Sequence, residues 1–334
     1  MIDLAVEKSV KLCPMNDLSH PLPASAITTQ RGIIHRSRDK AAEILPDEQI
    51  DPFDLYESVA TCPVALSVPH GGWQYPQSLV TANNFKRCIS LADTGTSELG
   101  AMLAESHFPV LIASCGRAAC DLNRSLDALD GLLCSEVNTP VPVAFKPYVA
   151  AGYGVIPRLS ADKQPLYERI LDKAKWQSIL EKWHKPYHHK LANLLDRARM
   201  HYKNVVLIDL HSMPDNPDRS SRTRFFSSES QHLPDFVFGN LHGATLRQNN
   251  VERIDTVMGQ SGYSWQWNTP YAGGFITRHY GLHSKEDNTR PPVEVLQLEV
   301  NRRLYTAVNA TLDYDRMRPI KRVIKQIVDT LSDN

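Results

Sequence analysis

The segment Val205–Met213 constrains the fold more than any other part of the chain. Its first four residues are aliphatic and predict a buried strand, which then breaks at Asp-Leu-His-Ser-Met-Pro. His211 is therefore expected where the strand leaves the sheet, which is where open α/β sheets hold their binding groups. A second apolar run, Pro63–Val68, has the same layout, because His70 and two glycines follow it closely. The two imidazoles are expected to meet, and such a pairing most often builds a metal site.

The composition excludes several classes of partner. The 334 residues carry 37 Lys and Arg against 37 Asp and Glu, so neither nucleic acid nor an anionic membrane is indicated. No apolar run approaches the roughly twenty residues of a membrane span, and the N-terminus lacks the pattern of a secretory signal. The six cysteines form no CxxC pair, which is typical of reduced thiols in a cytoplasmic protein; a Cys115–Cys120 disulfide is the less favoured alternative.

Apolar runs alternate with helical periodicity, which predicts an α/β fold with a mixed, mostly parallel sheet covered on both faces. Residues 1–55 are rich in proline and poorly periodic, so an irregular N-terminal arm is expected there, followed by a single catalytic domain over 56–334. The core is expected to begin at Pro63. Further strands are expected at 109–114, 235–239, 274–277 and 293–299, and helices after Asp93, over 165–202 with a break at Pro186, and near 244–260, 301–312 and 319–331.

A catalytic zinc site takes about three protein ligands, so a third ligand is needed beside His70 and His211. Asp93 is the first choice, because it precedes a predicted helix, which it or Thr94 could cap, and is followed closely by a glycine. Glu98, one helical turn further on, is the rival. Asp209 lies two residues before His211 on the same strand face, where it either supports that ligand or bonds to the backbone.

Glu299 ends an otherwise apolar predicted strand. A buried carboxylate is costly unless it is paired or used. It either forms a salt bridge with Arg302 or Arg303, or it is a general base; the second interpretation is favoured.

Three arginines could recognise a substrate carboxylate. Arg124, in Asp-Leu-Asn-Arg, offers a planar fork for bidentate binding, and a structural ion pair with Asp121 is equally compatible with the sequence. Arg158 and Arg278 are weaker candidates of the same kind. The chain has no GxSxG, GxxxxGK[ST] or GxGxxG motif, which disfavours serine hydrolases and nucleotide-binding proteins.

Taken together, these segments resemble the N-formylglutamate amidohydrolase family, in the family's order and over roughly residues 52–315. The matching pieces are Val68–Gly72, Asp93 with Glu98 and Leu99, Asp121–Arg124, Gly152–Arg158, Lys185–His188, Asp209–Pro214, Pro270–Gly281 and Leu296–Arg302.

The resemblance implies a fold similar to that of the zinc carboxypeptidases, a three-layer α/β/α sandwich. It also implies hydrolysis of N-formyl-L-glutamate to formate and glutamate in histidine breakdown, with one Zn²⁺, or another divalent metal, held by His70, Asp93 and His211. Glu299 then resembles the general base. Substrate binding would fall to Asn123, Arg124, Arg158, Thr277, Arg278 and Tyr280.

The chain departs from the carboxypeptidases at one position that binds zinc in them. Carboxypeptidases bind zinc through a Glu three residues after the first His, and here that position is Trp73. The third ligand must therefore come from elsewhere, which again favours Asp93. Two rival functions remain open: a carboxypeptidase or deacylase acting on a peptide or another N-acyl amino acid, and a non-catalytic protein that binds a small acid.

Overall fold

The computed structural model describes residues 10–13, 42–58, 61–106, 108–215, 233–283, 291–307 and 311–333. Its strands are β1 (Val10–Cys13), β2 (Glu43–Leu45), β3 (Phe53–Ser58), β4 (Val64–Val68), β5 (Gln74–Pro76), β6 (Val110–Ala113), β7 (Val205–Met213), β8 (Phe236–Gly239), β9 (Trp265–Trp267) and β10 (Val293–Asn301). Its α-helices are α2 (Phe85–Ile89), α3 (Thr96–Ala104), α4 (Lys146–Ala150), α5 (Lys173–Ile179), α6 (Lys185–Arg199), α7 (Gln248–Ser261), α8 (Phe275–His283) and α9 (Tyr314–Ser332).

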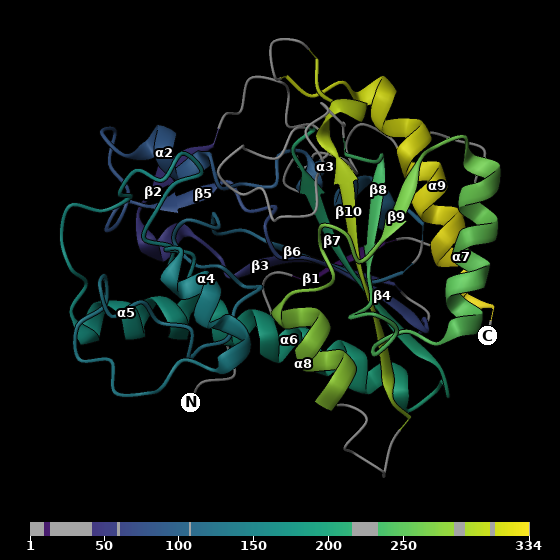
Figure 1. Ribbon diagram of the computed structural model, residues 1–334, viewed down its shortest axis with the longest axis horizontal. Helices are drawn as coiled ribbons and strands as arrows, with labels where there is room; N and C mark the ends of the chain where they lie inside the picture. The colour runs from purple at the N-terminus through teal and green to yellow at the C-terminus, as the bar shows by residue number, and fades with distance from the viewer. Residues whose placement is uncertain are drawn as a thin grey trace.

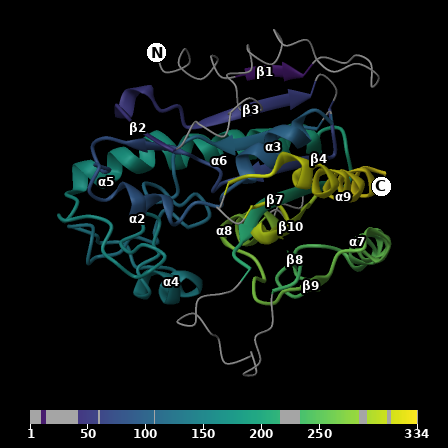
Figure 2. The same cartoon turned by 90° about the horizontal axis from the view of Figure 1, so that it is seen from above.

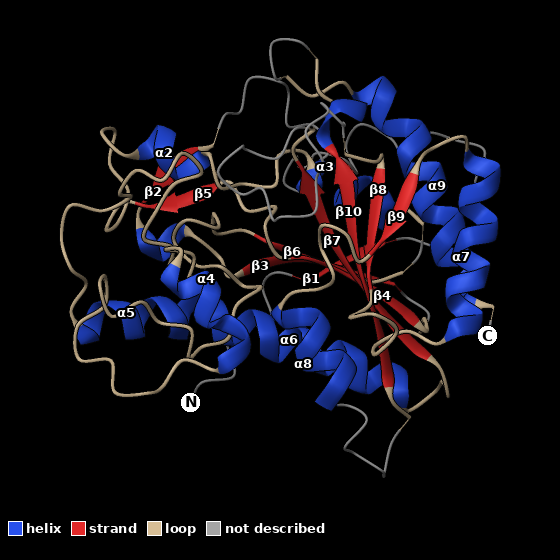
Figure 3. Cartoon of the chain, viewed as in Figure 1, coloured by secondary structure: helices blue, strands red, loops and turns tan. Residues whose placement is uncertain are grey.

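Eight of the strands form one mixed sheet in the order β1-β3-β6-β4-β7-β10-β8-β9. The four central strands, β6, β4, β7 and β10, run parallel, and an antiparallel neighbour, β3 or β8, borders them on each side. Figure 3 shows these strands as one fan with helices around it. The expected α/β fold with a mixed, mostly parallel sheet is confirmed. The carboxyl ends of the four central strands meet at one edge of the sheet.

The two faces of the sheet have separate hydrophobic cores. Along β7, Val206, Ile208 and Leu210 belong to the core under α3, α7 and α9, whereas Leu207 belongs to the core under α6 and α8. In Figures 1 and 2, α7 and α9 lie together on one side of the sheet, and α6 and α8 lie on another. Because side chains alternate along a strand, Asp209 shares the face of Leu207, on the side of α6 and α8.

The break expected at Pro186 is present. A π-helical turn, Leu180–His184, separates α5 from α6, and Pro186 lies in the first turn of α6. Proline has no N–H for an intrahelical bond, so it is tolerated at a helix start and not in the interior. Among the described residues no helix is both long enough and apolar enough to cross a membrane.

Several local expectations are wrong. Residues 274–277 begin helix α8 and do not form a strand, and only a short 3₁₀ turn, Arg302–Leu304, stands where a helix over 301–312 was expected. The sheet also begins before Pro63, because β3 contributes buried Phe53 and Leu55. Cys115 and Cys120 are free thiols. The division of the chain at residue 55 stays a prediction, and residues 14–41 lie outside the described part.

Candidate metal centre

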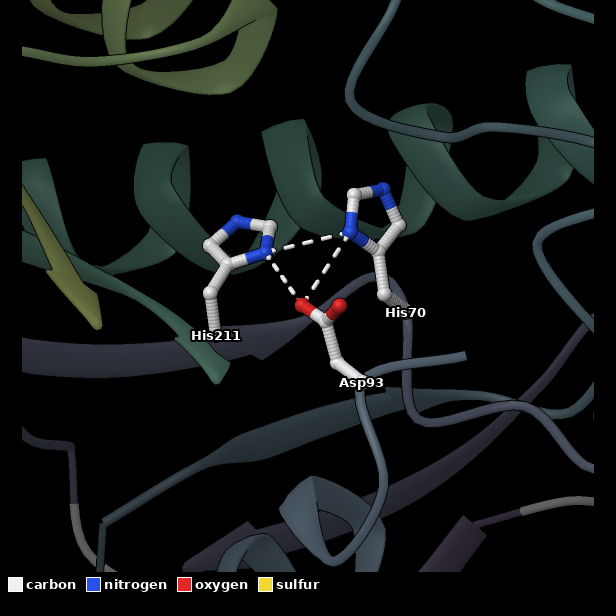
Figure 4. A group of neighbouring side chains, drawn as sticks. All are labelled: His70, Asp93 and His211. Atoms are coloured by element: carbon white, nitrogen blue, oxygen red, sulfur yellow. Dashed lines mark hydrogen bonds and ion pairs between the residues drawn. The ribbon is translucent and has the colours of Figure 1, made fainter. Parts of the chain in front are cut away.

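Two histidines and one aspartate meet at the carboxyl edge of the parallel strands (Figure 4). His70 follows β4 by two residues, and His211 lies near the end of β7. Asp93 comes from the loop before α3. This loop is joined to the backbone at His70, because the Asp93 N–H donates to the His70 carbonyl. All three side chains are almost fully buried, at 3 %, 2 % and 5 % exposure for His70, His211 and Asp93.

The three facing atoms are the Nδ1 nitrogens of both histidines and Oδ2 of Asp93. The two nitrogens lie 3.1 Å apart, and Asp93 Oδ2 lies 3.3 Å from His70 Nδ1 and 3.0 Å from His211 Nδ1. These atoms form the group of potential ligands that the described residues bring together. Ligands of a tetrahedral zinc with nitrogen bonds of about 2.0–2.1 Å stand about 3.3–3.4 Å apart, which is close to the spacing found here.

The far nitrogen of each imidazole donates to a buried carboxylate. His70 Nε2 lies 2.7 Å from Asp121 Oδ1, and His211 Nε2 lies 2.9 Å from Asp209 Oδ2. In a neutral imidazole, a hydrogen on Nε2 leaves a lone pair on Nδ1. The lone pairs of the two Nδ1 atoms and of Asp93 Oδ2 therefore point at one another. Only a positive charge between them, a proton or a metal ion, makes that arrangement favourable. Carboxylates behind the histidines are the usual support of a protein metal site.

The pKa values of these groups reflect the same need for positive charge. Burial alone would lower the pKa of His211, but the charge of Asp209 and the hydrogen bonds of the imidazole to the Asp209 and Asp93 carboxylates raise it well above its ordinary value. Burial opposes ionisation of Asp93, yet His70 and His211 hold its pKa well below the usual range. The donor set and its supporting carboxylates therefore fit a divalent cation.

A glycine permits the loop after β4 to lie against the segment that follows β6. A Cβ on Gly72 would stand 1.9 Å from the Cys115 carbonyl oxygen, which is a backbone atom that cannot move aside. Any larger residue would displace the loop that carries His70.

Glu98, the rival third ligand, lies on α3 and lines a surface groove of about 530 Å³ with Met102 and Arg322. It accepts a hydrogen bond from Ser97 Oγ at 2.9 Å and is absent from the group of potential ligands. Helix α3 also begins differently from the expectation, because Gly95 stands at its cap position without a side-chain bond from Asp93 or Thr94.

Measurements of metal binding can show whether Asp93 or Glu98 is the third ligand. We expect Asp93→Asn to reduce metal affinity by more than the roughly 10- to 100-fold typical when only a partner of a ligand is lost. Glu98→Gln should retain the affinity of the unmodified protein, since Glu98 lies on the groove side of α3. Equilibrium dialysis with Zn²⁺ measures both variants. Retention of metal by Asp93→Asn and its loss from Glu98→Gln would move the third ligand to Glu98.

Glu299 lies directly beside this group. In the parallel pair of β7 and β10 it is the register partner of His211, as Gln297 is of Asp209. The salt bridge considered for Glu299 is not formed within the described residues, because Arg302 pairs with Asp93 and Arg303 pairs with Asp215 and Asp235. Glu299 Oε1 instead accepts a hydrogen bond from Gln297 Nε2, at 3.0 Å.

The environment of Glu299 raises its pKa to about 7. Burial is the largest cause, His211 and Arg117 lower the pKa, and the negative charges of Asp93 and Asp209 raise it further. A carboxyl group with a pKa near neutrality is suited to accept and return a proton.

Asn123 and Arg124 lie close to this centre, but many of their donors are in use. Asn123 Nδ2 donates to Asp209 Oδ2 at 3.3 Å, and its Oδ1 accepts the Ile276 N–H at 2.8 Å. Arg124 donates through Nε and Nη1 to the carbonyls of Tyr153 and Asn123, and its guanidinium stacks 4.2 Å from the ring centre of Tyr148. Asp121 pairs with Arg117, not with Arg124.

The remaining predicted substrate groups are more scattered. Arg158 forms an ion pair with Asp130 at 2.7 Å, and Tyr280 donates to the His188 carbonyl at 3.1 Å. Thr277 is fully buried, and its hydroxyl has no hydrogen-bond partner among the described residues. Arg278 lies half-buried on α8.

Several residues of the centre were not predicted from the sequence. Asp121 was considered only as a partner for Arg124, and Arg302 only as a partner for Glu299, while Arg117 and Gln297 were not considered. The signal for Arg117 is its spacing, since an Arg four residues before an Asp can form an ion pair within one turn of chain, as it does at 3.0 Å.

Comparison with known proteins places this geometry in context. A model of the family "N-formylglutamate amidohydrolase" matches residues 62–306. N-formylglutamate deformylases of Pseudomonas putida and Pseudomonas aeruginosa are 28% and 27% identical to the chain, each over 80% of this chain and 92% of the relative. The crystal structure of N-formylglutamate amidohydrolase from Ralstonia eutropha JMP134 superposes with a TM-score of 0.72 at 26% identity, over 84% of this chain and 98% of that chain.

Proposed function

Since the chain belongs to the N-formylglutamate amidohydrolase family, we propose that it hydrolyses the formyl amide of N-formyl-L-glutamate, or of a related N-acyl amino acid, to formate and the amino acid. The observation that carries the proposal is the convergence of His70, Asp93 and His211 beside Glu299, a buried carboxylate whose expected arginine partners bind elsewhere. The proposed setting is histidine breakdown in the cytoplasm.

The proposed cofactor is Zn²⁺, held by His70 Nδ1, His211 Nδ1 and Asp93 Oδ2. When bound there, such an ion supplies a Lewis acid for the amide oxygen and lowers the pKa of water towards about 7. Asp121 and Asp209 keep the Nε2 protons of the two imidazoles in place, so both Nδ1 atoms stay free to bind a cation.

Glu299 is the proposed general base. Its carboxylate takes a proton from the attacking water and passes it to the nitrogen that leaves. Gln297 holds it through the Nε2 hydrogen bond, and the Gln297 amide is itself oriented because its Oε1 accepts the Gly274 N–H at 2.8 Å. Glu299 is thus held by Gln297, its neighbour on the same face of β10, and Gln297 is held in turn by the loop before α8.

Arg124 is the proposed clamp for a substrate carboxylate. Its guanidinium is only 7 % exposed and its orientation is fixed by two carbonyls and the Tyr148 ring, so its remaining N–H groups are presented rigidly. Asn123, Arg158, Thr277, Arg278 and Tyr280 complete the proposed substrate-binding set.

If Arg124 clamps the substrate, Arg124→Ala should cost about 2–5 kcal/mol of transition-state binding, the range for truncating one partner of a buried charge pair. Arg124→Lys should not restore the loss, because an ammonium cannot form the bidentate pair. A substrate with its side-chain carboxylate amidated should react poorly with the unmodified protein and lose little more with Arg124→Ala. The measurement is kcat/KM for the four combinations of protein and substrate. Strictly additive losses would show that Arg124 does not touch the carboxylate.

The substrate class is tested by what the protein releases. The proposal predicts formate from N-formyl-L-glutamate at a higher kcat/KM than acetate from N-acetyl-L-glutamate or free C-terminal residue from a dipeptide. Faster release from a dipeptide would favour a carboxypeptidase. Tight binding of a small acid without any turnover would favour a binding protein.

A further inference from the structure

Arg302 connects three segments that meet at the metal centre. It follows β10 directly, and its Nε donates to Ser212 Oγ at the end of β7, at 2.9 Å. Its Nη2 donates to the Ala92 carbonyl at 3.0 Å, on the loop that carries Asp93. The same nitrogen lies 3.3 Å from the Ser212 carbonyl and 3.4 Å from Asp93 Oδ1. One guanidinium therefore ties the Asp93 loop to both strands that carry His211 and Glu299.

The two oxygens of Asp93 have different surroundings. Oδ2 faces the two Nδ1 atoms and also accepts the Ser212 N–H, at 3.3 Å. Oδ1 faces cations instead, since Arg302 Nη2 lies 3.4 Å away and Arg117 Nη1 lies 3.6 Å away. The carboxylate is 5 % exposed, so solvent contributes little to its orientation.

We infer that Arg302 is a positioning residue that fixes Asp93 so that Oδ2 alone is offered to the metal. The inference rests on the proposed function, because it takes Asp93 as a ligand. With Oδ1 held by guanidinium groups, the protein supplies three ligand atoms and not four. The centre then keeps room for a water molecule and a substrate oxygen, as catalytic zinc sites do.

A purely electrostatic role and a positioning role of Arg302 predict opposite changes in metal affinity when this residue is replaced. A guanidinium 3.4 Å from a ligand oxygen repels a nearby cation, so a purely electrostatic role means that its removal strengthens metal binding. If Arg302 positions Asp93, its removal frees the loop and the carboxylate. Metal affinity should then fall by about 10- to 100-fold, the usual effect of losing a partner that orients a ligand.

The experiment measures Zn²⁺ affinity of chelator-stripped protein by competition with a chromophoric chelator, together with the thermal midpoint of each metal-free protein. Arg302→Gln removes both the positive charge and the planar guanidinium group with its several N–H donors. Arg302→Lys keeps the charge, but one ammonium cannot reach Ala92, Ser212 and Asp93 together. The matched control is Arg303→Gln, because the neighbouring Arg303 pairs with Asp215 and Asp235 and, within the described part of the chain, forms no ion pair with Asp93.

We expect weaker Zn²⁺ binding in both Arg302 variants and unchanged binding in Arg303→Gln. Unchanged or tighter binding in Arg302→Gln, or full affinity in Arg302→Lys, would overturn the inference while the proposed function stands. If Arg302→Gln does not fold, as its metal-free thermal midpoint would reveal, Arg302→Lys decides alone. Absence of Zn²⁺ binding by the unmodified protein would overturn the metal-dependent function and the inference together.

Discussion

Replacing Glu299 by Gln should lower kcat by roughly two to four orders of magnitude while the protein still binds metal and substrate, the usual scale for loss of a general base. The amide has the shape of the carboxylate and its oxygen can still accept the hydrogen bond from Gln297, so the fold of β10 should be kept. What is lost is the proposed proton acceptor. Steady-state formate release, with metal content measured on the same sample, gives the result.

Strand β10 offers a matched control for this variant. Glu294 is also buried, at 6 % exposure, but its carboxylate accepts bonds from Arg247 and Asn250 at the start of α7, so it serves that helix and not the metal centre. Glu294→Gln should lower stability by about 1–3 kcal/mol, the cost of impairing a buried hydrogen-bonded charge, with kcat unchanged. Near-normal turnover in Glu299→Gln would return Glu299 to a structural role.

Replacing His211 by Ala should abolish both metal binding and hydrolysis. The variant removes one of the three proposed ligand atoms and leaves Asp209 and Asp93 without their shared partner. Circular dichroism and metal analysis of the same sample separate loss of metal from loss of fold. His189→Ala is the control, because His189 is exposed on α6. Stoichiometric zinc in folded His211→Ala would show that His211 is not a ligand.

The parts of the fold that were predicted correctly are those that local sequence encodes. β4, β7 and β10 are apolar runs in the chain, and each is a fully buried strand in the sheet. Parallel strands bring their carboxyl ends to one edge, so the meeting of His70 and His211 followed from their positions after such runs. Asp93 was proposed on other grounds, since it precedes a predicted helix and is followed closely by a glycine.

Helix α8 shows why other parts could not be predicted. Phe275, Ile276 and Thr277 favour a strand locally. The first turn of the helix is fixed by Asn123, which accepts the Ile276 N–H through its side chain and lies about 150 residues earlier in the chain. Gly274 is needed at this contact, because a Cβ there would stand 2.4–2.6 Å from the Asn123 side chain. A helix start that depends on so distant a residue leaves no local pattern.

The supporting residues of the centre were missed for the same reason. Asp121 and Arg302 act through contacts between loops that only the folded chain brings together, at sequence separations of 51 residues to His70 and 209 residues to Asp93. The two histidines stand at or near strand ends, which a sequence reveals, whereas Asp121 and Arg302 stand outside the strands and α-helices, in segments that a sequence does not place.

In the proposed mechanism, hydrolysis of the formyl amide depends on a metal ion held by His70, Asp93 and His211. Its most direct test is formate release from N-formyl-L-glutamate by protein of measured metal content, before chelation, after chelation and after Zn²⁺ is returned. We predict one equivalent of metal in the active protein, loss of formate release on chelation and recovery when Zn²⁺ is added. Full formate release by protein shown to contain no metal would exclude a metal-dependent reaction.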